Sequence, residues 1–293
     1  MRMRVLLLGK SSLLGRALTV QAAAEDIEFL TLDEEPADWQ PSAIAGWLDA
    51  LQPDAVVDLA FYHQQFQVLA PTAEALDQHT AFARQLIAEC RQRDLLLCML
   101  SNTRVFDGSM GQPYTEKDPL QPIGLHGAQQ AALDSLLEQC CSRHLLLRFS
   151  WVLDSSEGGL LQRLISQLCS GETVVLAEEW RGNPTPVADM ARVVLSALKQ
   201  LDCNAQLYGC YHYASGEMAS WISFARTLAQ ELVSCGRIER EPGIEPVAFE
   251  TQPAAAVEPR NAVLSGRRLL HVFGIKPRTW RIGLPELLDK KIP

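Results

Sequence analysis

The sequence predicts an α/β fold: a Rossmann-type doubly wound parallel sheet with a smaller C-terminal α/β substrate lobe. Three features lead to this class, namely short apolar segments, longer helical patterns between them, and a glycine-containing loop after the first segment. The apolar segments are rich in Val, Ile and Leu and lack polar alternation, which is typical of strands buried on both faces. These segments are Val5–Leu8, Ile27–Leu32, Ala55–Ala60, Leu95–Leu100 and His144–Phe149.

Helical patterns fill the intervals between the apolar segments. They cover Leu13–Ala24, Ser42–Leu51, Ala73–Arg93 and Gly127–Cys141. Alternation of this kind predicts strands joined by right-handed helical crossovers. We expect the first five strands to start near residues 3, 27, 54, 95 and 144.

The alternation of strand and helix patterns becomes irregular after residue 150, which predicts a second lobe. A turn cluster at Gly182–Pro186 and a proline-rich stretch at Arg240–Pro259 interrupt the pattern. We therefore expect residues 1–149 and 186–214 to form the Rossmann domain, and 150–185 and 215–293 to form the smaller lobe. The long irregular stretch Asn102–Leu125 is expected to be functional, because such loops are uncommon inside compact domains.

Composition excludes several classes of partner. A net charge of −9 argues against binding to nucleic acid. No apolar run is long enough to cross a membrane, and Val5–Leu8 is too short for the core of a secretory signal. The eight cysteines show no metal-binding spacing. We expect reduced thiols in a cytoplasmic protein without a metal site.

The loop between the first strand and the first helix resembles a dinucleotide-binding turn. Gly9 and Gly15 allow a tight turn, and the helix beginning at Leu13 would place free amides on a pyrophosphate. Asp33 follows the second strand, where a carboxylate binds the ribose of NAD, and Asp38 in the same loop is a further candidate. The alternative is an ordinary turn followed by solvated acids.

Later motifs resemble those of the dTDP-4-dehydrorhamnose reductases, which are extended short-chain dehydrogenase/reductases. Ser101–Gly108 is similar to their S-T-D-Y-V-F-D-G, and Pro113–Asp118 with Pro122 is similar to P-Y-x-E-x-D … P. The likeness continues in order through segments similar to R-T-S-W-V, G-x-P-T … D-L-A, G-x-Y-H … W and N-S-V-L. These segments are Arg148–Val152, Gly182–Thr185 with Asp189–Ala191, Gly209–His212 with Trp221, and Asn261–Leu264.

This resemblance implies a Rossmann domain that binds NAD(P)H and a C-terminal lobe that binds a nucleotide sugar. The implied reaction is hydride transfer to a 4-keto sugar. In the family a tyrosine donates the proton, a lysine lowers the pKa of that tyrosine, and a threonine or serine hydrogen-bonds the carbonyl. Trp151, Thr185, Asp189 and His212 are expected to pack and brace the fold.

All three catalytic positions carry other residues in this chain. The threonine, tyrosine and lysine of the family fall on Asn102, His126 and Gln130. A phenol with a pKa near ~10 needs a neighbouring cation to work at neutral pH, and Gln130 carries no charge. His126 could donate a proton, since its ordinary pKa is about 6.5, and Asn102 could donate a hydrogen bond. The alternative is that His126 only begins a helix.

Substitutions also fall on the implied cofactor site. The middle glycine of the family's G-x-x-G-x-x-G is Ser12. The family's A-A-A-Y-T is Leu59–His63, so Ala60 keeps a small side chain but Phe61 brings a bulky one. We expect Ser12 and Phe61 to crowd NAD(P), unless Phe61 turns into the core. Glu258 replaces an arginine of the family, which puts phosphate recognition there in doubt.

Together these features favour a divergent family member that lacks reductase activity and acts as a nucleotide-sugar-binding or regulatory protein, with a protein partner or a second copy as candidate partners. The regulatory β subunit of methionine adenosyltransferase, which resembles the same reductases, is a precedent by fold alone. The alternative is an active NAD(P)H-dependent reductase that uses His126 as its acid. Epimerisation or hydrolysis has no nucleophile–base pair to support it.

Overall fold

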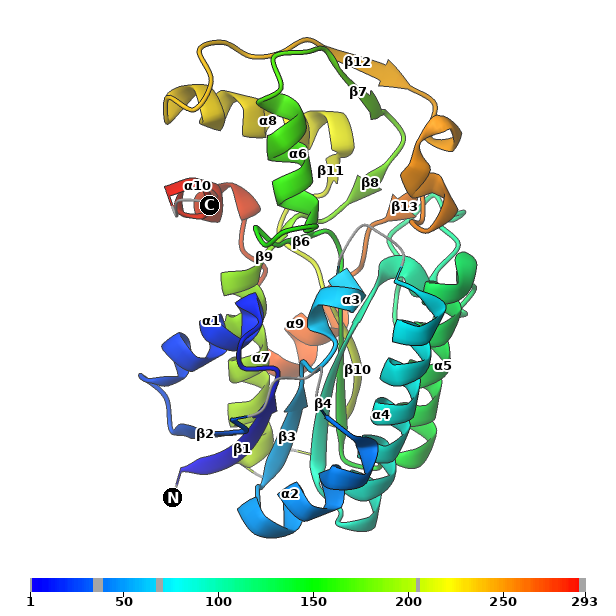
Figure 1. Ribbon diagram of the computed structural model, residues 1–293, viewed down its shortest axis with the longest axis vertical. Coiled ribbons are helices and arrows are strands. Elements are labelled where there is room, and N and C mark those ends of the chain that lie inside the picture. The colour runs from blue at the N-terminus through cyan, green and yellow to red at the C-terminus, as the bar shows by residue number, and fades with distance from the viewer. Residues whose placement is uncertain (1, 34–38, 67–70, 204–205, 290–293) are drawn as a thin grey trace.

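The centre of the molecule is a parallel sheet of six strands (Figure 1). The computed structural model describes residues 2–33, 39–66, 71–203 and 206–289. In spatial order the strands are β10 (Gly209–Tyr213), β5 (His144–Phe149), β4 (Leu96–Asn102), β3 (Ala55–Asp58), β1 (Met3–Leu8) and β2 (Ile27–Thr31). Every neighbouring pair is parallel. The predicted fold class is confirmed, and the first five strands begin within one residue of their predicted positions.

Helices cover both faces of the sheet, as the lack of polar alternation in the strands requires. Val5 and Leu7 of β1 face one core, whereas Leu6 and Leu8 face the other. The first core is closed by α1 (Leu13–Ala22), α7 (Val187–Asp202) and α9 (Arg267–Phe273). The second is closed by α2 (Ile44–Leu51), α4 (Ala73–Gln92) and α5 (Gly124–Cys140).

A second lobe lies over the carboxyl edge of the sheet (Figure 1). Its core gathers the rings of Trp151, Trp180 and Trp221, whose centroids lie 4.8–5.3 Å apart. Its helices are α6 (Leu160–Leu168), α8 (Trp221–Ser234) and α10 (Trp280–Asp289). Its paired strands are β7 (Val174–Ala177) with β12 (Ile244–Val247), β6 (Val152–Leu153) with β9 (Thr185–Pro186), and β8 (Arg181–Gly182) with β11 (Ala219–Ser220) and β13 (Asn261–Ala262). The proposed lobe boundaries stay a prediction, and α9 from the C-terminal part packs on the large sheet.

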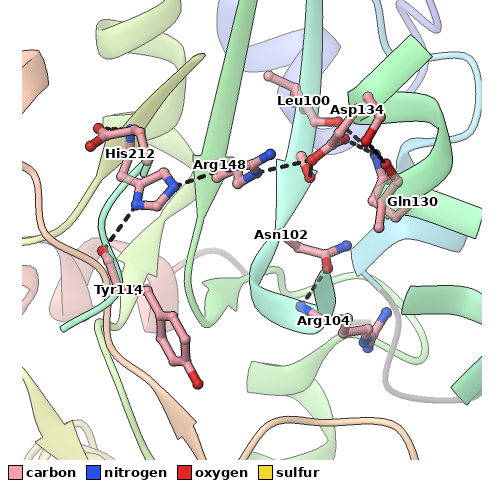
Figure 2. Close-up of polar contacts among 12 residues, drawn as sticks. Leu100, Asn102, Arg104, Tyr114, Gln130, Asp134, Arg148 and His212 are labelled. Carbon is pink, nitrogen blue, oxygen red and sulfur yellow. Dashed lines mark hydrogen bonds and ion pairs between the residues drawn. The ribbon is translucent and has the colours of Figure 1, made fainter. Parts of the chain in front are cut away.

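A buried ion pair ties α5 to the sheet (Figure 2). The guanidinium of Arg148 on β5 lies 2.9 Å from the carboxylate of Asp134, and their side chains are 2% and 1% exposed. On its other side Arg148 contacts Nε2 of His212 on β10 at 3.3 Å. Burial, together with the charge of Arg148, lowers the pKa of His212 to about 3, so this imidazole is neutral. The network therefore joins β5, β10 and α5 through one buried cation.

Removing the charge of Asp134 should destabilise the fold strongly. In Asp134→Asn the guanidinium of Arg148 stays buried without a counter-ion, a loss of about 3–5 kcal/mol in the free energy of unfolding. The matched control is Glu217→Gln, which breaks the surface pair between Glu217 and Arg281 (47% and 51% exposed) and should cost less than about 1 kcal/mol. Urea titrations followed by tryptophan fluorescence measure both losses. Equal losses would show that the buried pair does not brace the fold.

Candidate functional site

The nucleotide loop lies between β1 and α1 and is shaped by close contact with β3. Gly9 has a φ of 80°, and a Cβ added there would lie 2.2 Å from the carbonyl oxygen of Leu59. Only glycine fits this position, because a side chain would meet both steric and backbone strain. The turn brings the beginning of α1 to the carboxyl edge of the sheet, the ligand position of this fold class.

Ser12, the substituted middle position of the loop, is the N-cap of α1. Its Oγ donates to the carbonyl of Gly9 (2.8 Å) and accepts from the amide of Gly15 (3.0 Å). The hydroxyl is therefore held inside the turn, where it accepts a hydrogen bond from the amide of Gly15, one of the amides at the beginning of the helix. The backbone amides of Leu13 and Leu14 precede Gly15 in the first turn of α1, so they have no acceptor within the helix.

The two predicted ribose carboxylates differ in what the structure describes. Asp33 is fully exposed, and the ammonium of Lys10 lies 3.8 Å from its carboxylate. Asp38 lies outside the described residues. The acid and the cation next to the loop are thus both at the surface.

Ala60 and Phe61 follow β3, as expected, and form one wall of an open cavity of about 750 Å³. The ring of Phe61 stacks on buried His79 with 4.6 Å between centroids and packs edge-on against Phe82 at 5.7 Å. Burial lowers the pKa of His79 to about 4. Phe61 is half-buried and lines this cavity rather than filling it.

A short helix that the sequence patterns did not predict, α3 (Tyr62–Phe66), follows directly and contacts β4. The backbone carbonyl of Gln65 accepts hydrogen bonds from the Asn102 side-chain amide (2.9 Å) and from the guanidinium of Arg104 (3.0 Å). These bonds hold the C-terminal end of α3 over the end of β4. In this way α3 occupies part of the cleft between the lobes.

Asn102, at the position of the family's threonine, has both ends of its amide engaged. Its Nδ2 donates to Gln65, and its Oδ1 accepts from the backbone amide of Arg104 at 2.9 Å (Figure 2). The residue as a whole is buried, with 6% of its surface exposed. Asn102 therefore serves as a cap and a tether in this structure.

His126, at the position of the family's tyrosine, is buried in the first turn of α5. Its Nδ1 lies 3.0 Å from the guanidinium of Arg104, which can only donate, so this nitrogen accepts and the proton is on Nε2. The pKa of His126 is lowered to about 3, mainly by burial and to a smaller extent by the charge of Arg104. The imidazole is therefore neutral at physiological pH.

Gln130, at the position of the family's lysine, points away from this cluster. Its Nε2 donates to the carboxylate of Asp134 at 2.9 Å (Figure 2), and the residue is completely buried. Gln130 thus belongs to the network of Asp134, Arg148 and His212. The structure brings Asn102 and His126 together around Arg104, whereas Gln130 lies in the buried network of Asp134 and Arg148.

The most important contact in the cleft is the ion pair between Arg104 and Glu258. Two guanidinium nitrogens of Arg104 lie 2.8 and 2.5 Å from Oε1 of Glu258, and both residues are buried. Arg104 follows β4, whereas Glu258 precedes β13 of the smaller lobe, so the pair joins the two lobes. The motif alignment contained a signal for it. Arg104 falls on the tyrosine of the S-T-D-Y-V-F-D-G motif, which is not the catalytic tyrosine, and Glu258 falls on an arginine of the family. A cation and an anion therefore replace these two residues at positions 154 apart in sequence.

The inner end of the cleft is closed by this cluster. The cavity among Gln65, Asn102, Arg104, Trp151 and Glu258 has a volume of only about 30 Å³. That is room for about two water molecules. The cavity beside the nucleotide loop that Phe61 lines, called the outer cavity below, is much larger at about 750 Å³.

Two other kinds of site were searched for in the part of the chain that the structure describes. There, no helix combines the length and the apolar character that a membrane crossing needs. Within the same residues, no three His, Cys, Asp or Glu side chains come together as metal ligands.

Comparison with known proteins identifies the family. The model of the RmlD substrate binding domain matches residues 3–292. The dTDP-4-dehydrorhamnose reductase of Burkholderia thailandensis is 26% identical over 289 residues, covering 96% of this chain and 97% of the relative. That of Shigella flexneri is 22% identical, with 98% of each chain covered.

A solved structure shows the same fold. A dTDP-4-dehydrorhamnose reductase from Clostridium acetobutylicum superposes with a TM-score of 0.81 at 22% identity, covering 98% of this chain and 99% of that one. Since the family model spans almost the whole sequence, the chain belongs to the RmlD substrate binding domain family, the family of the dTDP-4-dehydrorhamnose reductases.

Proposed function

We propose that this chain is a member of the family without reductase activity, which acts as a binding or regulatory protein. The observation that carries the proposal is the buried Arg104–Glu258 ion pair, which lies beside Asn102, a position that the resemblance assigns to catalysis, and leaves little space there. A nicotinamide ring is far larger than the remaining volume of about 30 Å³. A nucleotide-sugar ligand is therefore proposed only at the smaller lobe, outside the closed inner cavity.

The protonation state of His126 supports the proposal that this residue does not donate a proton to a substrate. A general acid works best when its pKa lies near the working pH. The pKa of His126 is lowered to about 3, so the imidazolium form is not available at neutral pH. The neutral imidazole is a very weak acid, and its Nδ1 is already occupied by Arg104. The alternative of a reductase with His126 as its acid therefore lacks a charged donor.

The first prediction concerns turnover. With a dTDP-4-keto-6-deoxy sugar and either NADH or NADPH we expect oxidation of the cofactor at background, because loss of a general acid alone typically costs about a hundred- to ten-thousandfold in rate. A dTDP-4-dehydrorhamnose reductase assayed in parallel is the positive control. Turnover that disappears in His126→Ala would contradict the proposal and support the alternative enzyme.

The second prediction concerns restoration of the triad. In the triple variant Asn102→Thr, His126→Tyr, Gln130→Lys we expect turnover to stay at background, because the Arg104–Glu258 pair still closes the inner cavity. Adding Arg104→Ala and Glu258→Ala, which remove both side chains of the pair, should enlarge this cavity and tighten NADPH binding at least tenfold relative to the triple variant, about 1.4 kcal/mol. Calorimetric titration measures the affinities. Turnover by the triple variant alone would refute the closed-cavity argument.

The third prediction uses pH to test the neutral state of His126. In the unfolded chain His126 takes up a proton near its ordinary pKa of 6.5, whereas in the folded protein it does so only near 3. The stability that this imidazole contributes is therefore present above pH 6.5 and is lost as the pH falls below it. Between pH 7 and pH 5 this one group should account for about 2 kcal/mol of lost stability.

The variant His126→Gln keeps an acceptor for Arg104 and should lose less stability than the wild type over the same pH interval. Urea titrations at pH 7 and pH 5 measure the difference. The control is His271→Gln, the same exchange at an exposed position, which should leave the free energy of unfolding at pH 7 unchanged. Identical pH dependence in the wild type and His126→Gln would mean that His126 is not held neutral.

A further inference from the structure

A further surface lies on the face of β8 that points away from the inner cavity. Trp180 lines the inner cavity, whereas the next residue, Arg181, lines a separate cavity of about 280 Å³. Side chains alternate between the two faces of a strand. A Cβ added at Gly182 would lie 2.5 Å from the ring of Trp151, which again is on the side of the inner cavity. The separate cavity therefore lies on the opposite face of β8.

This cavity adjoins another of about 320 Å³, because Pro113, Met218 and Val263 line both. We name the two cavities together the rear groove. The loop after β4 forms one of its walls and is held by β13, the strand beside β8 (Figure 1). The side-chain amide of Asn261 on β13 donates to the carbonyl of Met110 in that loop at 2.7 Å. The rear groove is therefore formed before any partner binds.

The middle of the rear groove and its second cavity are apolar. Met218, which lines both cavities, is 62% exposed. A single exposed methionine is ordinary, but one beside a concave aliphatic surface offers an adaptable contact for an apolar partner. The aliphatic side chains that line the second cavity are those of Val263, Leu264, Leu270 and Ile275.

The charge of the rear groove is opposite in sign to that of the whole chain. Arg181 and Arg260 line the first cavity, and Arg267 lines the second. Against these three cations stands one carboxylate, that of Glu179, which already accepts a hydrogen bond from the backbone amide of Phe249 at 3.1 Å. The formal net charge of the chain is −9, so the excess of cations here is a local feature that favours an acidic partner.

The guanidinium groups of the first cavity are available to such a partner. Arg260 lies 3.6 Å from Glu250, and both side chains are at least half exposed, so this pair contributes little to stability. Within the described residues, no carboxylate forms an ion pair with Arg181. Carboxylates bound here would gain charge-assisted hydrogen bonds without breaking a strong internal pair.

We propose that the rear groove binds a peptide segment of another protein, with acidic side chains on Arg181 and Arg260 and apolar side chains over Met218 and the second cavity. Alternate residues of an extended peptide lie about 6.6 Å apart on one face, so they reach neighbouring cavities. A small inorganic anion would use the arginines alone and leave the apolar cavity without a partner. The inference rests on the proposed binding role, for which it names the class of partner.

Selection of phage-displayed random octapeptides on the full-length protein tests the inference. We expect the enriched peptides to combine Asp or Glu with apolar residues. A synthetic copy of the most enriched peptide should bind in fluorescence anisotropy, and Arg181→Glu with Arg260→Glu should weaken this binding at least tenfold. The same peptide with Lys in place of its acidic residues should bind that double variant more tightly than it binds the wild type, a gain that an unfolded variant could not give.

The matched control is Arg163→Glu with Arg226→Glu, which makes the same change of net charge at exposed positions of α6 and α8 outside the rear groove. This control should bind the selected peptide as the wild type does. Met218→Asp should weaken the binding at least tenfold, because it puts a carboxylate where the apolar side chains of the peptide would lie.

The outcomes separate this inference from the proposed function. No enrichment, enriched peptides without acidic residues, or equal weakening in the two double arginine variants would each overturn it. A dimer in sedimentation velocity that dissociates in Arg181→Glu with Arg260→Glu would overturn it in favour of a second copy of this chain. The reductase assay is read independently: turnover with NADPH would overturn the proposed function, whereas absent turnover with a failed peptide selection would overturn the inference alone.

Discussion

The guanidinium of Arg104 is the group around which the cleft of this protein is organised. A buried cation is tolerated only when its donors are matched by acceptors and its charge by an anion. Glu258 supplies the anion from the other lobe, and the carbonyl of Gln65 and Nδ1 of His126 supply further acceptors. Each of these partners is thereby fixed. The requirement to satisfy one buried cation explains why α3 lies over β4, and the charge of Arg104 adds to burial, the main cause, in keeping His126 neutral.

Two cavities with different physical properties lie at the carboxyl edge of the sheet, and the Arg104–Glu258 pair lines the smaller one. The inner cavity is small and bounded by the Arg104–Glu258 pair, and two buried polar atoms at its wall, Oε1 of Gln65 and Nε1 of Trp151, have no hydrogen-bond partner within the described residues. The outer cavity is bounded by aromatic rings and amide side chains and meets the loop before α1. In a fold that binds ligands at the carboxyl edge of its sheet, the larger cavity is the one with room for a small-molecule ligand.

The side chains at the three positions that the resemblance assigns to catalysis form hydrogen bonds within the protein. Asn102 caps the turn after β4 and tethers α3, His126 accepts from Arg104, and Gln130 joins the buried network of Asp134 and Arg148. Their bonds are internal to the protein, and none of the three points into open space. Ser12 shows the same behaviour, since its hydroxyl is used within the turn that it caps. The residues at these sites therefore contribute hydrogen bonds that support the fold.

The sequence by itself determined the α/β class and the starts of five strands. It also predicted a nucleotide loop and, from the resemblance, the replacement of the family's catalytic residues at Asn102, His126 and Gln130. These features are local, because each depends on periodicity or on residue type at a fixed spacing. Only the tertiary structure decided that Arg104 meets Glu258, that α3 folds over β4, and that Phe61 lines a cavity instead of filling it. Such pairings join segments far apart in the chain, and no local pattern records which buried charge will find which partner. The chemistry of the cleft follows from those pairings, so the sequence could show which groups had changed but not what they now contact.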